Sequence, residues 1–285
     1  MSTTKYQAIA AAVLTITLAA CGGGGGGSGA STQTTSSGQT STTGSGATTQ
    51  ASGDYLFSGS APTVTGTNGK VSIIFSANAL SSTSMSGPSF YNPGVALTSV
   101  TQQAAYGGAF TTLNTGSNSI DLTKGSTIAD INGAGGFIAI GRWTKGSDTS
   151  GGNYTANQGG IYAVGNPLTL TAGTGTLACS SAMATSPTSV AGSVAPGTLT
   201  AATATFDKAT LMLTNFSAKV TIGSDVNATL TKASLSPTGL QIGGGLATMA
   251  EPMGNDASKP FIAIAYGAKL TNTGDISGMV VLSCQ

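Results

Sequence analysis

The chain has 285 residues, with ten Lys and Arg side chains against nine Asp and Glu, so its formal net charge is +1. A neutral surface argues against nucleic acid as a partner. The sequence contains no histidine, which removes the usual general base near neutral pH, the Ser–His–Asp triad and the commonest metal ligand. We therefore predict that the protein is not an enzyme and that it has no catalytic residues, cofactor or metal.

Residues 1–20 are predicted to be a lipoprotein signal peptide. Lys5 precedes an apolar run from Ala8 to Ala20, which is too short to cross a bilayer as a permanent helix. The stretch Leu18-Ala19-Ala20-Cys21 resembles a bacterial lipobox, which implies that Cys21 is acylated and becomes the first residue of the mature protein. The alternative is an ordinary secretory signal that is followed by a cysteine by chance.

Residues 21–53 are expected to form a lipid-anchored tether. From Gly22 to Ser52 the only residue types are Gly, Ser, Ala, Thr and Gln, which cannot bury enough apolar surface to fold. A flexible coil of this length spans roughly 30 Å. Because each buried methylene of the acyl chains contributes about 0.8 kcal/mol, attachment to the membrane should be permanent. Gly22 in the second mature position, rather than Asp, resembles the sorting pattern of Gram-negative lipoproteins and implies the outer membrane.

Residues 54–165 are predicted to be an irregular β region. Gly and β-branched residues occur throughout, and no long stretch has the apolar spacing of a helix. The turn Gly66-Thr67-Asn68-Gly69 leads into a strand. The predicted strands of this region are Lys70–Ala77, Val95–Val100, Ala109–Leu113 and Gly136–Trp143.

Residues 166–285 are predicted to form an antiparallel up-and-down β-barrel of about eight strands, because short strands and turn residues alternate at a regular spacing. An open sheet with so few charges would leave edges without the usual protective lysines. The predicted strands are Leu168–Ser180, Thr198–Phe206, Ala209–Ile222, Val226–Leu235, Gly239–Ile242, Phe261–Leu270 and Ile276–Cys284. The expected fold class is all-β.

Three sequence runs carry a resemblance: GRWTKG, IYAVGNPLTLTAGTGTLACSSAMATSPTS and GTLTAATATFDKATLMLTNFSAKVTIG. They resemble the β-barrel regions of proteobacterial lipoproteins of the transferrin-binding-protein-like type, over about half the chain from Gly141 onward. One departure is Ile140, where a second Trp is expected. The resemblance implies a small calycin-like barrel that is exposed in the periplasm or at the cell surface, and it carries over no catalytic residues.

Cys179 and Cys284 remain once Cys21 is acylated, and two spare thiols in an exported protein are usually oxidised to a disulfide. They lie in the first and last predicted barrel strands, which are neighbours in a closed barrel, so the bond would hold the barrel closed. The alternative is two buried free thiols.

Arg142 and Trp143 are the only Arg and the only Trp of the chain. On a strand their side chains leave opposite faces, so they are not expected to form one site. The favoured interpretation is structural, with Trp143 filling one end of the barrel and Arg142 capping backbone carbonyls; the alternative is an aromatic ligand contact beside a cation.

The run EPMGND, Glu251 to Asp256, contains the only Glu and is the densest acidic stretch. It is interpreted as the solvated end of a hairpin, in which Pro252 and Gly254 shape the turn. A weak calcium site is the less favoured alternative, because the run lacks the ligands of a dedicated calcium loop.

The leading functional hypothesis is a lipid-anchored outer-membrane lipoprotein that acts as a non-catalytic binding or envelope-interaction module. Its partner would be a protein, or a small apolar ligand carried in the barrel lumen. The lumen should be filled if Leu211, Leu213, Phe216 and Ile264 point inward. A second hypothesis is an envelope enzyme that acts on carbohydrate or peptidoglycan with two aspartates. A structural spacer is a third.

Overall fold

The computed structural model describes residues 49–52, 54–78, 80–84 and 88–285. Cys21, the predicted signal peptide and most of the predicted tether lie outside these residues. The regular elements of the described chain are β-strands, apart from one short 3-10 helix at Leu97–Ser99, so the predicted all-β fold class is confirmed. None of the helical segments in these ranges has the length and apolar character needed to cross a membrane.

The first sheet lies in the N-terminal half of the described chain and has seven strands. All of its strands pair antiparallel except β2 and β8, which run parallel. In spatial order the strands are β1 (Thr49–Ser52), β2 (Tyr55–Gly59), β8 (Thr127–Ala134), β9 (Ile138–Thr144), β12 (Gly160–Gly165), β3 (Lys70–Ala77) and β4 (Ser89–Ala96). Two small sheets flank it, β5 (Thr101–Gln103) with β6 (Ala109–Asn114) and β7 (Ser119–Asp121), and β10 (Gly146–Ser147) with β11 (Asn153–Tyr154).

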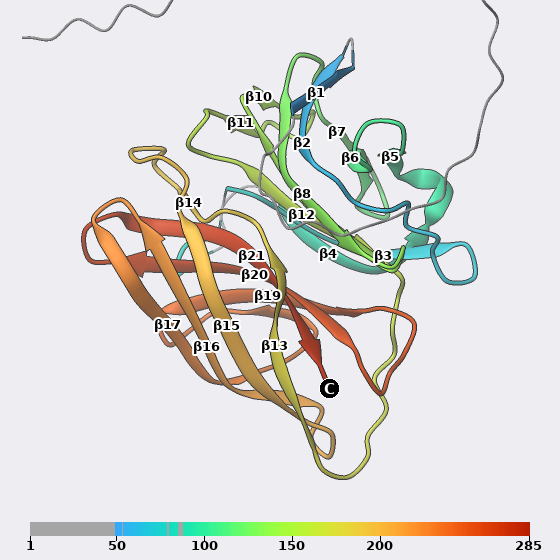
Figure 1. Cartoon of the computed structure of the whole chain (residues 1–285), viewed down its shortest axis with the longest axis vertical. Coiled ribbons are helices and arrows are strands. Elements are labelled where there is room, and N and C mark those ends of the chain that lie inside the picture. Colours follow the sequence, from blue (N-terminus) through green and yellow to red (C-terminus); the bar gives the residue numbers. More distant parts are fainter. Residues whose placement is uncertain (1–48, 53, 79, 85–87) are drawn as a thin grey trace, which may run out of the picture. The chain divides into compact units, whose positions relative to one another are not determined.

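The second sheet follows the up-and-down order that the sequence predicts and curls into a half-barrel (Figure 1). Its strands, in spatial order, are β17 (Asp225–Leu235), β16 (Met212–Ile222), β15 (Thr198–Asp207), β13 (Thr176–Ala184), β21 (Gly274–Cys284), β20 (Phe261–Leu270), β19 (Leu246–Met253) and β18 (Gly239–Gln241). The short strand β14 (Thr188–Ser189) also pairs with β21. The first and last long strands, β13 and β21, are neighbours, and the two edges of the sheet are β17 and β18.

Two of the predicted strands need correction, and the prediction missed several others, among them β19. Residues 168–175 do not continue β13, because this segment crosses from one sheet to the other. Val95–Val100 is divided between the end of β4 and the 3-10 helix. Strand β19 was not predicted. All eight of its residues are buried, so its sequence, LATMAEPM, lacks the alternation of apolar and polar residues that marks a half-exposed strand. Pro252 is tolerated in β19 because β18 pairs only with Thr248 to Ala250, so Pro252 has no pairing partner in β18.

Both sheets are apolar on both faces at their centres, which explains the continuous apolar runs in β12, β19 and β20. In β20, Ile262 and Ile264 face the interior of the half-barrel, whereas Ala263 and Ala265 join a second cluster shared with the first sheet. That shared cluster includes Ile74 and Ile140, so the two sheets pack against each other and belong to one compact unit. The far face of the first sheet packs a third cluster around Trp143 and Tyr162.

Side chains fill the interior of the half-barrel. Leu213, Phe216 and Ile264 are buried in one cluster, and Leu211 packs against it while remaining partly exposed. All four residues therefore lie where the sequence places them. Around these residues the interior of the half-barrel is occupied by the protein's own core.

Gly267 of β20 allows the two sheets to approach, because a Cβ at this position would overlap the carbonyl group of Leu80. We expect Gly267→Ala to lower the free energy of unfolding by about 1 to 3 kcal/mol, measured by urea denaturation. Gly173→Ala is the matched control, since a Cβ there would meet only the Cβ of Lys208 at 4.0 Å. Equal stability of the two variants would contradict this account of the interface.

Candidate functional site

A cavity of 520 Å³ lies at the end of the half-barrel where the β15–β16 and β17–β18 turns meet the end of β19. We call it the mouth pocket. Its remaining walls come from β4 of the first sheet and from the segment that joins the two sheets. The lining residues are Tyr91, Pro93, Leu168, Thr169, Leu170, Thr210, Leu211, Met212, Ser236, Pro237, Thr238, Glu251 and Pro252.

Glu251 is the buried polar group of the mouth pocket, with only 4% of its surface exposed. The salt bridges of the described residues, Lys124–Asp54 and Arg142–Asp130, do not involve it. Burial raises the pKa of Glu251 to about 7, although the hydrogen bond with Ser72 opposes this shift. The carboxyl group therefore titrates near neutral pH.

Ser72 connects Glu251 to the first sheet. Its Oγ lies 3.1 Å from Glu251 Oε1 and 3.0 Å from the carbonyl oxygen of Pro93. Ser72 is the donor in both contacts, but its hydroxyl has one proton, which the carboxylate of Glu251 must share with the carbonyl of Pro93. The carbonyl of Pro93 is available because β4 has a register shift opposite Ser72. The shared donor offsets only part of the effect of burial, which agrees with the raised pKa.

The interpretation of EPMGND as one solvated hairpin end is wrong for its first half. Glu251, Pro252 and Met253 belong to the buried strand β19, and the turn begins after them. Asp256 does lie in an exposed turn, where hydrogen bonds from the Ser258 side chain and backbone lower its pKa. The signal that could have revealed the strand is the apolar context of LATMAEPM, which is typical of a strand covered on both faces.

Leu211, in the wall of the mouth pocket, has an uncommon backbone conformation, with a φ of 56°. Within the described part of the chain, six other non-glycine residues have a positive φ, and none of these six has an apolar side chain. A leucine in this region is strained by on the order of 1 to 3 kcal/mol, and such strain gathers at binding sites. Leu211 therefore combines a strained backbone with a position in the lining of the pocket.

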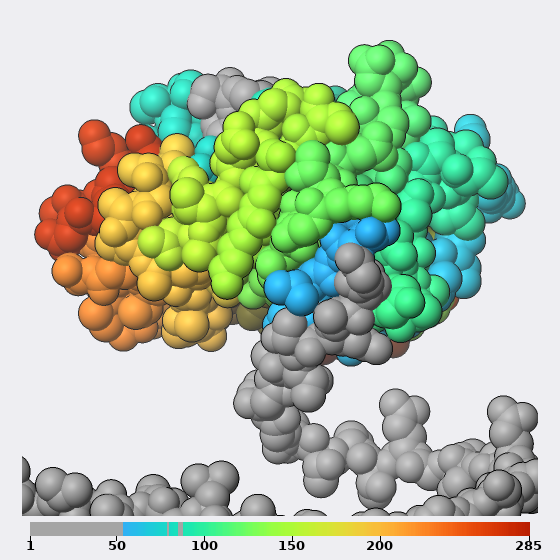
Figure 2. Space-filling view, turned by 90° about the horizontal axis from the view of Figure 1, so that it is seen from above, coloured from blue at the N-terminus to red at the C-terminus, as the bar shows by residue number. Residues whose placement is uncertain are grey.

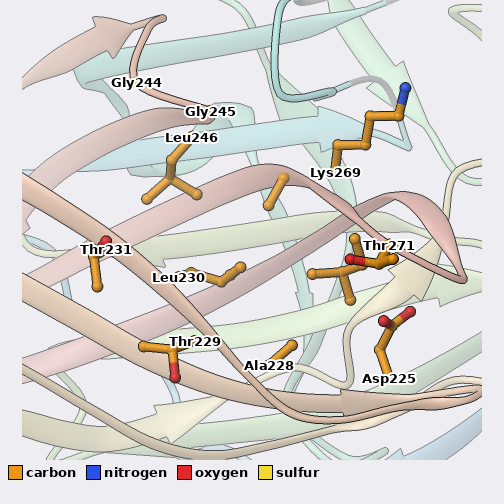
Figure 3. A pocket seen from close by; sticks show the side chains of 12 residues that line it. Asp225, Ala228, Thr229, Leu230, Thr231, Gly244, Gly245, Leu246, Lys269 and Thr271 are labelled. Carbon is orange, nitrogen blue, oxygen red and sulfur yellow. The ribbon is translucent and has the colours of Figure 1, made fainter.

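A second cavity, of 380 Å³, lies between β17 and the chain that links β18 to β20. We call it the edge pocket; Figure 3 shows residues of β17 on one side of it and Gly245, Leu246 and Lys269 on the other. The Nζ of Lys232 donates across this gap to the carbonyls of Gln241, at 3.4 Å, and Leu246, at 3.1 Å. Burial lowers the pKa of Lys232. This lysine therefore joins the two edges of the half-barrel.

Asp225 lines the edge pocket, but its carboxylate is occupied. It accepts hydrogen bonds from the amides of Asn272 and Thr273, the latter at 2.7 Å. Hydrogen bonds, first from the side chain of Thr273 and then from the backbone, lower the pKa of Asp225. Because this carboxylate fixes the β20–β21 turn, the edge pocket presents no buried acid comparable to Glu251.

Arg142 and Trp143 point to opposite faces, as predicted. Arg142 Nε lies 2.7 Å from Asp130 Oδ2, and one terminal nitrogen donates to the carbonyl of Gln158 at 3.3 Å. The prediction that Trp143 fills one end of the barrel is wrong. Trp143 lies in the core of the first sheet, where its Nε1 donates to the carbonyl of Phe110 at 2.8 Å and its ring packs 5.0 Å from that of Phe75.

Asp130 also links the two sheets. It accepts hydrogen bonds from the backbone amide of Ser186, at 2.9 Å, and from its hydroxyl, at 3.0 Å. Nearby, Gln158 Nε2 donates to the carbonyl of Val190 at 2.8 Å and Asn157 Nδ2 to that of Gly192 at 3.1 Å. Figure 2 shows this surface, where the lime and yellow parts of the chain adjoin. These groups hold the sheets together and do not form a pocket.

Asp148 is a further buried carboxylate that the sequence did not single out. It accepts hydrogen bonds from the amides of Ser150, at 2.8 Å, and Gly152, at 3.2 Å, and from the hydroxyl of Tyr154. Burial, followed by the hydrogen bond to Asp148, raises the pKa of Tyr154. The cluster closes the turn between β10 and β11.

The disulfide between Cys179 and Cys284 is present, as predicted. The two cysteines are direct partners in the pairing of β13 with β21, and both are buried in the interior of the half-barrel. The bond is therefore a structural link between the first and last long strands. Cys21, the predicted lipidation site, lies outside the described residues.

The mouth pocket is thus the site in which a buried carboxyl group without a cation partner meets apolar walls. Apolar cavities of a few hundred Å³ with a small number of polar groups are typical of ligand sites. Comparison of the chain with protein-family models, with curated proteins and with solved structures gives no match.

Proposed function

We propose that this protein is a lipid-anchored lipoprotein of the outer membrane whose β body is a non-catalytic binding module. The observation that carries this proposal is the contrast between the filled interior of the half-barrel and the mouth pocket at its end. Recognition then takes place at the mouth pocket and the surrounding turns. A ligand carried inside the barrel is the less favoured version, because Leu213, Phe216 and Ile264 occupy that space.

The contacts of the aspartates favour binding over catalysis. Asp130 pairs with Arg142, Asp148 closes a turn, and Asp225 fixes the β20–β21 turn. An enzyme that acts on polysaccharide would instead need two carboxyl groups free to act on one substrate. This envelope-enzyme hypothesis therefore has less support than the binding module.

The membrane anchor is supported by the sequence alone. Acylation at Cys21, followed by a tether without charges or large apolar groups, would hold the β body outside the bilayer. The two remaining cysteines form the disulfide and are not available for acylation.

We expect metabolic labelling with a palmitate analogue to mark the wild-type protein and to be absent from Cys21→Ala, because this cysteine is the proposed acyl acceptor. The double variant Cys179→Ala/Cys284→Ala is the matched control and should retain the label. The readout is in-gel detection of the purified protein. Label that persists in Cys21→Ala, or a wild-type protein without label, would refute the anchor. Protease shaving of intact cells then distinguishes a surface-exposed body from a periplasmic one.

A further inference from the structure

We propose that the mouth pocket binds an organic cation, a protonated amine on an apolar body, with the ammonium group against the carboxylate of Glu251. The proposal rests on the binding function above and names the class of ligand. Its basis is the position of a buried carboxyl group, without a cation partner, in the wall of a 520 Å³ cavity.

The first step concerns charge. A buried carboxylate is normally paired with a cation or satisfied by several donors. Among the described residues, the side chain that is hydrogen-bonded to Glu251 is that of Ser72, whose one proton is shared with the carbonyl of Pro93. Without a donor of its own, the buried carboxyl group tends to keep its own proton, in agreement with its raised pKa. An ammonium group brings three N–H donors and a positive charge, so it can replace that proton.

The second step concerns the walls. Leu168, Leu170 and Met212 provide apolar surface for the body of the ligand. Tyr91 also lines the pocket and is 45% exposed, and the face of an aromatic ring attracts cations. A neutral apolar ligand would supply no charge to pair with the carboxylate of Glu251, and an anionic one would be repelled by it.

The third step is a proton linkage. Tyr91 is the other titratable side chain in the pocket wall; Lys70 of β3 lies beside Gly94 of β4, Asp207 ends β15 and Lys208 follows it, and β20 carries Tyr266 and Lys269. Burial raises the pKa of Glu251 to about 7. Since the cation binds the carboxylate form, its apparent affinity should be about tenfold higher at pH 8 than at pH 6.

The test uses three probes of similar shape: benzylammonium, benzyl alcohol and benzoate. The full mature protein is placed in phosphatidylcholine nanodiscs, and binding is followed by ligand-observed NMR at pH 6, 7 and 8, with empty nanodiscs as the blank. We expect benzylammonium to bind more tightly than benzyl alcohol, benzoate to bind least, and only benzylammonium to show the tenfold pH dependence.

Glu251→Gln keeps the shape of the side chain and removes its charge. We expect this variant to bind benzylammonium about tenfold more weakly at pH 8 and to lose the pH dependence, while benzyl alcohol is unaffected. Tyr91→Leu is the second variant, at an exposed position, so the substitution leaves the core intact. It should lower the affinity for benzylammonium about two- to fivefold and keep the pH dependence.

Equal affinity for benzylammonium and benzyl alcohol, or a pH dependence that persists in Glu251→Gln, would overturn the cation proposal. Absence of binding by every probe would overturn it as well. None of these results bears on palmitate labelling at Cys21, so a failure of this proposal can be told apart from a failure of the anchored lipoprotein.

Discussion

Replacing Cys179 and Cys284 together by alanine is expected to lower the free energy of unfolding by about 4 to 5 kcal/mol. The bond joins positions 105 residues apart, so in the chain-entropy model it removes much of the conformational freedom of the unfolded chain. It also links β13 to β21, the pair that brings the start and the end of the half-barrel together. Urea denaturation of the oxidised protein and of the double variant measures the difference.

Ser180→Ala/Ser283→Ala is the matched control for the disulfide. These residues are the next partners in the same pair of strands and are not covalently linked. We expect the control to change stability by less than about 1 kcal/mol, because Ser180 is exposed and Ser283 only half-buried. If Cys179→Ala/Cys284→Ala were as stable as this control, the pairing of β13 with β21 would hold the sheet without the disulfide.

The second sheet could be predicted from the sequence because its strands follow one another in space. Phe261–Leu270 has the predicted bounds, and the strands from Thr198 to Leu235 agree with the prediction to within a few residues. Turn residues mark the ends of the hairpins, so most neighbours in sequence are neighbours in the sheet; β17 and β18 are an exception, because they are its two edges. The pairing of Cys179 with Cys284 instead comes from the contact between the first and last long strands, β13 and β21.

The candidate site could not be predicted because it depends on contacts between the two sheets. Ser72 and Glu251 are 179 residues apart, and only the packing of β3 against β19 brings them together. The same packing buries both faces of β19, so its sequence lacks the alternation of a half-exposed strand. Trp143 was misplaced for a related reason: its strand belongs to the first sheet, whose far face has a core of its own.

The stability of the protein is expected to fall by about 3 kcal/mol as the pH rises from 4.5 to about 7, through Glu251 alone. Below pH 4.5 the carboxyl group is protonated in both the folded and the unfolded chain, so it has no effect. Between 4.5, its ordinary pKa, and about 7, its pKa in the folded protein, the unfolded chain loses the proton and the folded chain keeps it. Unfolding then releases a proton, which is why a rise in pH favours the unfolded state.

The difference in unfolding free energy between wild type and Glu251→Gln isolates this effect, because glutamine does not titrate. The difference should change across pH 4.5 to 7 and be flat outside this window. Asp207, Asp225 and Asp256 do not interfere, since hydrogen bonds lower their pKa values below the ordinary 3.8 and their contribution is lost only as the pH falls below that value. A flat difference, or one of opposite sign, would mean that Glu251 is ionised in the folded protein at acidic pH. Benzylammonium should reduce the loss of unfolding free energy above pH 7, because it binds the folded protein in which Glu251 is ionised.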